Sequence, residues 1–212
     1  MSRHYSGWLI GAALAIELVL SSPVAASDEM PSVLLYMANE AGISSDIVGD
    51  AKQEVVRIYA QIGVRVMWAE DVAGNPNNPL VIIMPATTGD WVGTRSLGIA
   101  LRGTHSSGRV AYVFYDRIQP LAREHQMSDA SLLGLVIAHE IGHLLLPNGR
   151  HSPSGLMQGK WDSLQLSLAR ARLLRFTAEQ AELIRAHLIE AQGQSPKEED
   201  ANDCMRVEPL SR

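Results

Sequence analysis

The sequence is poor in cysteine, with Cys204 as the single example among 212 residues. No disulfide can form within the chain, so a metal site would have to use histidines and carboxylates rather than thiolates. Lysine and arginine form no run with interleaved aromatic residues, and the formal net charge is −5. This balance argues against a nucleic-acid partner and against a basic helix on a membrane surface. We interpret Cys204 as a free thiol, with an intermolecular disulfide as the alternative.

Apolar runs long enough for a membrane span are also missing. The apolar run at residues 8–20 is too short to cross a membrane comfortably. It follows a weakly basic start and precedes the small residues Val24 and Ala26, in the order of a secretory signal peptide. We predict that residues 1–26 are a signal peptide cleaved after Ala26, and that the mature protein is exported, either periplasmic or secreted. An uncleaved N-terminal anchor is the alternative.

The rest of the chain predicts one α+β domain with a mixed sheet over residues 27–192, and a polar, disordered tail over residues 193–212. Apolar spacing and capping residues predict helices at 44–62, 128–146 and 177–191, with weaker helical periodicity at 162–175. Runs rich in β-branched residues predict strands at 64–70, 80–86, 97–101 and 109–118. Residues 27–43 have mixed character and are assigned to no element, and residues 74–79 form a loop.

The helix predicted at 128–146 contains the sequence HEIGH, with His139, Glu140 and His143. Residues four apart on a helix are separated by about 400° of rotation and roughly 6 Å of rise, so both imidazoles lie on one face and can bind one zinc ion. Glu140 lies one step around the helix, where it can act as a general base toward a water on the open side of the metal. The helix is strongly apolar, and buried histidines beside a glutamate need a partner.

A catalytic zinc needs a third protein ligand. Pro147 ends the helix and Asn148-Gly149 permits a tight reversal, which would bring His151 back toward the metal. A carboxylate on the last helix, Glu179 or Glu182, is the rival third ligand.

The stretch HEIGHLLLPNGRHSPSGLM, residues 139–157, resembles the active-site signature of the metzincin zinc peptidases, HExxHxxGxxH followed by a turn with a buried methionine. The resemblance implies a zincin-like fold with a C-terminal helix after the turn, and one catalytic Zn²⁺ bound by His139, His143 and His151. It implies Glu140 as general base and acid, and Met157 as the methionine of that turn. Simple filling of the core is the other interpretation of Met157.

The match departs from the usual signature in its connection. His151 follows His143 by eight residues, where the usual form has six, so we interpret the connection as a variant turn similar to that of small secreted bacterial metzincin-like proteins. No tyrosine follows Tyr115, which leaves the stabiliser of the transition state unassigned.

In metzincins an edge strand above the cleft pairs with the substrate backbone. The resemblance places that role on Ala111, Tyr112, Val113 and Phe114, and an ordinary interior strand is the alternative. The expected activity is endopeptidase cleavage of a peptide or protein substrate, without nucleic acid and without membrane association after signal cleavage. A zinc hydrolase with a glutamate as third ligand, or a secreted zinc-binding module without catalysis, are the alternatives.

Overall fold

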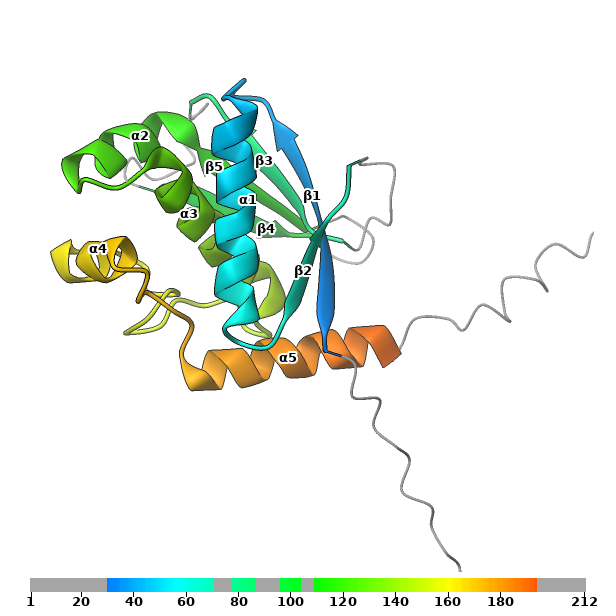
Figure 1. The fold of residues 1–212 in the computed structure, drawn as a ribbon. Helices are drawn as coiled ribbons and strands as arrows, with labels where there is room; N and C mark the ends of the chain where they lie inside the picture. Colours follow the sequence, from blue (N-terminus) through cyan, green and yellow to red (C-terminus); the bar gives the residue numbers. More distant parts are fainter. Residues whose placement is uncertain (1–29, 71–77, 87–95, 104–108, 194–212) are drawn as a thin grey trace, which may run out of the picture.

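The computed structural model describes residues 30–70, 78–86, 96–103 and 109–193. Within these ranges the chain forms five strands and five helices (Figure 1), in the order β1 (Ser32–Asn39), α1 (Ser45–Ala60), β2 (Arg65–Trp68), β3 (Leu80–Met84), β4 (Gly98–Arg102), β5 (Arg109–Phe114), α2 (Tyr115–Glu124), α3 (Asp129–Leu145), α4 (Ser163–Arg170) and α5 (Ala178–Gly193). The expected combination of helices with one mixed sheet is confirmed. The predicted signal peptide, the loop at 74–77 and the tail beyond Gly193 lie outside the described residues.

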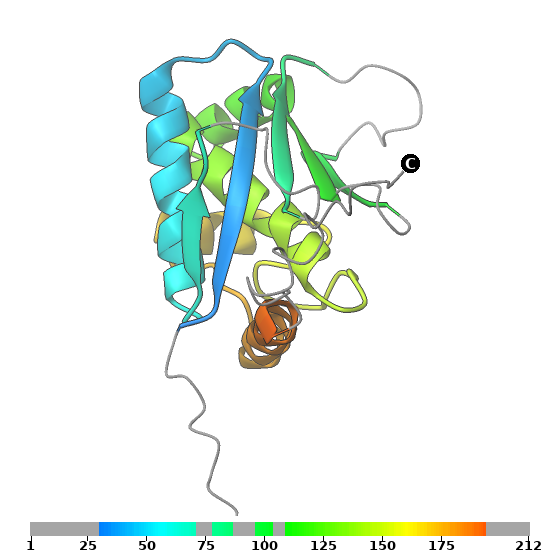
Figure 2. The ribbon, with the colours of Figure 1, turned by 90° about the vertical axis from the view of Figure 1, so that its right-hand side faces the viewer.

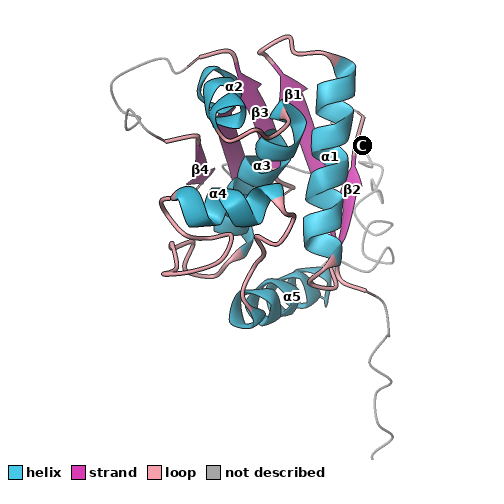
Figure 3. Cartoon of the chain, turned by 60° about the vertical axis from the view of Figure 1, so that its left-hand side comes forward, coloured by secondary structure: helices cyan, strands magenta, loops and turns pink. Residues whose placement is uncertain are grey.

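The five strands form one sheet in the order β2-β1-β3-β5-β4. Parallel ladders join β1 to β2 and β3, and β3 to β5, whereas β4 runs antiparallel to β5 at the sheet edge. Helices α1 and α3 lie side by side against the sheet (Figure 3), and Figure 2 shows the strands edge to edge with α3 behind them. The long helix α3 is therefore enclosed between the sheet and the other helices, and this arrangement fixes its position relative to β4.

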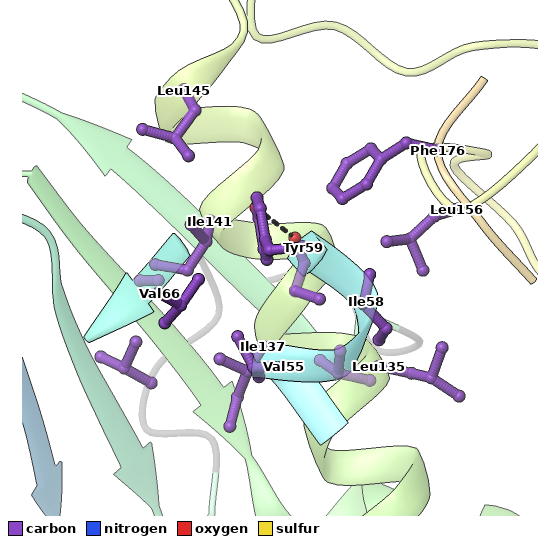
Figure 4. Packing of buried hydrophobic residues seen from close by; sticks show 14 of the residues in the cluster. Val55, Ile58, Tyr59, Val66, Leu135, Ile137, Ile141, Leu145, Leu156 and Phe176 are labelled. Carbon is purple, nitrogen blue, oxygen red and sulfur yellow. Dashed lines mark hydrogen bonds between the residues drawn. The ribbon is translucent and has the colours of Figure 1, made fainter. Parts of the chain in front are cut away.

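Helix α3 packs so closely on α1 that one position between them has no room for a side chain. A Cβ at Gly134 would lie 2.8 Å from the backbone oxygen of Ala51 and 2.7 Å from the Cβ of Glu54. From α1, the hydroxyl of the fully buried Tyr59 donates to the carbonyl of Ala138 at 3.1 Å. Figure 4 shows Tyr59 among the apolar side chains of α3 and the loop that follows it. These contacts hold the middle of α3, where the histidines begin, against a rigid partner.

The predicted helix starts are confirmed by their caps. Ser128 accepts a hydrogen bond from the backbone of Ser131 at 3.1 Å, and Ser44 caps α1 in the same way. At the start of α5, Thr177 and Gln180 exchange side-chain and backbone hydrogen bonds as a capping box. The cap at Ser128 sets the register of α3 and thereby the face on which its histidines lie.

One strand is missed, one segment has the wrong type, and one helix is shorter than its periodicity predicts. Residues 32–39, left without an element, form the strand β1 between β2 and β3. Residues 115–118, predicted as strand, begin α2, whose buried face is formed by Ile118 and Ala122 despite Pro120 in its interior. The weakly periodic stretch at 162–175 contains only the short helix α4, which Asp162 starts with a capping box.

The assignment of an edge strand to Ala111–Phe114 is also wrong. These residues belong to β5, which is bonded to β3 on one side and to β4 on the other. An interior strand has no free backbone groups for a substrate, because both of its ladders are already occupied. Among the described residues the edge strands are β2 and β4, and it is β4, expected only as a short strand among loops, that lies next to β5.

Among the described helices we find none with the length and hydrophobicity of a membrane span.

Candidate metal centre

The first two histidines lie on successive turns of α3, and each is oriented by a backbone carbonyl. His139 is 8% exposed, and its Nδ1 lies 2.7 Å from the carbonyl oxygen of Leu156. Nδ1 of His143 lies 2.8 Å from the carbonyl oxygen of Gly149. A carbonyl oxygen only accepts, so Nδ1 is the donor in both rings. Each neutral imidazole then presents the lone pair of its Nε2.

Those two Nε2 atoms face each other at a distance of 3.0 Å. Two lone pairs at this distance repel unless a proton or a cation lies between them. Burial lowers the pKa of His139 to about 4, and it also lowers the pKa of His143, so a proton is disfavoured at neutral pH. A metal ion satisfies both lone pairs, and no proton has to be displaced from either ring.

His151 completes a group of three. Its ring centroid lies 4.7 Å from that of His143 and 5.4 Å from that of His139. One ligand nitrogen from each ring lies within 4.8 Å of the other two. A tetrahedral zinc with Zn–N bonds of about 2.0–2.1 Å needs nitrogens roughly 3.3 Å apart. The three side chains could therefore hold a metal ion once their nitrogens move closer together.

The turn that returns the chain to the helix begins where α3 ends. Leu146 leaves the helical conformation, and the amide of Gly149 donates to the carbonyl of Leu146 at 3.1 Å. Gly149 has φ +55°, and a Cβ there would lie 3.0 Å from the carbonyl oxygen of His143. A glycine is favoured here because the backbone is left-handed and the space is filled. The sequence placed this reversal correctly at Asn148-Gly149.

A second turn, residues 155–158, lies beneath the histidines. The amide of Gln158 donates to the carbonyl of Gly155 at 3.1 Å. Met157 is fully buried, and its sulfur packs against Gly142, where an added Cβ would lie only 2.5 Å from it. In the same turn the carbonyl of Leu156 accepts from His139 and from the indole of Trp161. The side chain of Met157 thus fills the space under α3 while the neighbouring backbone orients a histidine.

The side chain of Glu140 lies against the edge strand β4. It is 5% exposed, and burial raises its pKa to about 8. A Cβ on Gly98 of β4 would lie 2.8 Å from both Cγ and Oε1 of Glu140, so the carboxyl group occupies space that only a glycine leaves open. A nearby divalent cation would oppose this shift, because an opposite charge stabilises the carboxylate.

The histidines and Glu140 open on a cleft of about 990 Å³ that the edge strand β4 borders on one side. Its other wall includes Lys160 and Trp161 from the loop after the second turn, and Leu121 and Val136 contribute apolar surface. This volume is at the upper end of the range of about 300–1,000 Å³ that is usual for ligand-binding clefts.

The rival third ligands are not part of this group. Glu179 and Glu182 are exposed on α5, and in the described part of the chain the three histidines form the only group of metal-ligating side chains found. Sequence reasoning missed Gly98 and Gly159, which make room for Glu140 and His151. It also missed Arg102, which contacts the end of α3. Their roles depend on contacts between distant segments, and no local pattern marks them.

Neither a comparison with models of known families nor one with curated proteins finds a match for this sequence. The structure shows a three-histidine site that could hold a metal ion. What the site does has to be argued from its own geometry.

Proposed function

We propose that this protein is a zinc-dependent endopeptidase of the metzincin type. The observation that carries the proposal is the pair of facing Nε2 atoms, 3.0 Å apart on His139 and His143, with His151 beside them and a buried glutamate next in sequence to the first histidine. Three neutral imidazoles around an open position are the ligand set of a catalytic zinc.

When bound, zinc supplies Lewis-acid activation of water and of a peptide carbonyl. Glu140 would take the proton of the attacking water on its carboxylate and pass it to the leaving amine. The backbone carbonyls of Leu156 and Gly149 keep the Nδ1 protons of His139 and His143 in place, and so hold Nε2 toward the metal. Met157 supports the centre from below.

The substrate strand of the proposal is β4 rather than β5. Among the described residues β4 is bonded to a strand on one side only, β5, and it borders the cleft. An extended peptide could add to this edge by β-augmentation, with the scissile bond near Glu140. This assignment keeps the edge strand that the resemblance implies and moves it to Gly98–Arg102.

The proposed function includes export of the protein from the cytoplasm. A signal peptide at residues 1–26 would send residues 27–192 out of the cytoplasm as one catalytic domain. Peptide or protein substrates would be met there, without a nucleic-acid partner.

Zinc per chain, measured by elemental analysis on the parent, His151→Ala and Glu140→Ala, tests the proposal, with His125→Ala as a control for a histidine outside the group. We expect about one zinc per chain in the parent, the control and Glu140→Ala, and a large loss in His151→Ala. A peptide library should then be cleaved by the parent and by His125→Ala, but not by Glu140→Ala.

A parent without zinc would overturn the metal centre itself. A zinc-loaded parent that cleaves no peptide would leave a zinc-binding module instead of a peptidase. Zinc retained by His151→Ala would move the third ligand elsewhere.

A further inference from the structure

The side chain of Arg102, the last residue of β4, reaches across the cleft border to the end of α3. Its Nε donates to the carbonyl of His143 at 2.9 Å, and Nη1 donates to the carbonyl of Pro147 at 3.1 Å. Nη2 donates to the carbonyls of His143 and Leu146. One guanidinium therefore binds three backbone carbonyls of α3's last turn and of the turn that follows.

The carbonyl of His143 is one that a helix leaves without an intrahelical partner at its C-terminus, whereas the carbonyl of Leu146 also accepts from the amide of Gly149. A cation at this end also interacts favourably with the helix dipole. The fork of the guanidinium is rigid and planar, so it fixes the relative positions of the groups it binds. A lysine would supply the positive charge but not the planar arrangement of several N–H donors.

The clamped residues 143–147 include His143 and lead into the turn before His151. The carbonyl of Gly149, which orients the ring of His143 at 2.8 Å, belongs to the same turn. A Cβ on Gly149 would lie 3.4 Å from Cζ and Nη2 of Arg102, so this turn packs directly on the guanidinium. His151 follows two residues later.

We infer that Arg102 is a positioning residue of the metal centre, which locks the end of α3 and its turn to the edge strand so that His143 and His151 are held in place before a metal binds. The inference rests on the metal site of the proposed function, although not on its peptidase activity. An arginine with a merely structural role would affect unfolding, whereas a positioning residue also affects metal affinity in protein that is fully folded.

The neighbouring strand offers a matched control. Arg109 lies opposite Arg102 in the β4–β5 ladder, but its Nη1 lies 3.3 Å from Nε2 of His187 on α5. Arg185 provides a second control, because it donates to the carbonyl of Ile62 at 2.9 Å, far from the histidines. The effect of the Arg102 contacts can thus be distinguished from the effect of losing a positive charge and from the effect of losing any arginine–carbonyl hydrogen bond. The variants to compare are Arg102→Met, Arg102→Lys, Arg109→Met and Arg185→Met.

The first measurement is hydrogen exchange of the metal-free proteins. We expect the amides of residues 146 and 148–151 to exchange about tenfold faster in Arg102→Met than in the parent, and to be unchanged in the controls. The second is zinc affinity by chelator competition, with the absorption spectrum of the Co²⁺ form as a report on ligand geometry. Arg102→Met should bind zinc about 10- to 100-fold more weakly than the parent and show an altered cobalt spectrum.

Arg102→Lys keeps the charge, so it remains informative if Arg102→Met does not fold, and it should still bind zinc more weakly than Arg109→Met. Parental affinity and cobalt spectrum in both Arg102 variants would overturn the inference and leave the proposed function standing. Equal losses in Arg109→Met would also overturn it. A parent that binds neither metal would instead overturn the proposed function, and the inference with it.

Discussion

Replacing Gly142 by alanine should destabilise the protein, although the same change in most helices stabilises them. Alanine is favoured over glycine in a helix interior by about 1 kcal/mol. Here the added Cβ would lie 2.5 Å from the sulfur of Met157 and 3.0 Å from Cε1 of Phe176. Met157 is fully buried and cannot swing into solvent. Overpacking costs about 1–3 kcal/mol, and contacts this short favour the upper end, which leaves a net loss of about 2 kcal/mol.

The assay is urea unfolding of metal-free protein in chelator, so that metal binding does not contribute to stability. In a parallel thermal unfolding experiment, the melting temperature should fall by about 4–8 °C in a chain of this length. Gly49→Ala in α1 is the control, because no atom lies within 4 Å of a Cβ there. It should gain about 1 kcal/mol. Removing the sulfur with Met157→Ala should reduce the cost of Gly142→Ala in the double variant. A Gly142→Ala protein that gains as much stability as Gly49→Ala would refute the reasoning.

Three further changes test other contacts of the centre. A Cβ on Gly159 would lie 2.7 Å from Nδ1 of His151. Gly159→Ala should therefore weaken zinc affinity at least about tenfold in chelator competition. Zinc affinity equal to that of the parent would contradict this position of the His151 ring. Gly98→Ala should lower peptide turnover about 100-fold at unchanged zinc content, because it displaces Glu140; a parental rate would count against the role of that space. The folded-state pKa of Glu140, about 8, exceeds its ordinary value of 4.5. Folded protein then holds a proton that the unfolded chain has released, so metal-free parent should lose stability relative to Glu140→Gln as the pH rises from 4.5 to 8. Urea midpoints across this range check the sign, and parallel profiles for the two proteins would disprove it.

The parts that could be predicted from the sequence are those set by local spacing. The interval of four residues places His139 and His143 on one helix face, and the caps at Ser44, Ser128 and Thr177 fix helix starts within a residue or two. The reversal at Asn148-Gly149 follows from the conformations these residues favour.

The errors concern elements whose character depends on distant partners. β1 is a strand because β2 and β3 flank it, while its own sequence has no clean alternation. Residues 115–118 continue the run that predicts a strand at 109–118, yet they begin α2, which contains Pro120 in its interior. The order of strands in the sheet differs from their order in the sequence. Identifying the strands therefore does not reveal which of them lies at an edge. The same holds for Arg102, which acts on residues some forty positions away.

The place of β1 between β2 and β3 also has a consequence for how the chain folds. Ser32 is paired with Arg65 and Tyr36 with Leu80, so the first strand of the domain needs partners that come much later in the chain. Parallel pairing over such separations requires loop closure before any contact stabilises it, and it makes folding slow. An N-terminal segment that cannot complete its sheet early keeps the chain extended for longer. The sheet can close around β1 only once residues 65–68 and 80–84 are available to pair with it.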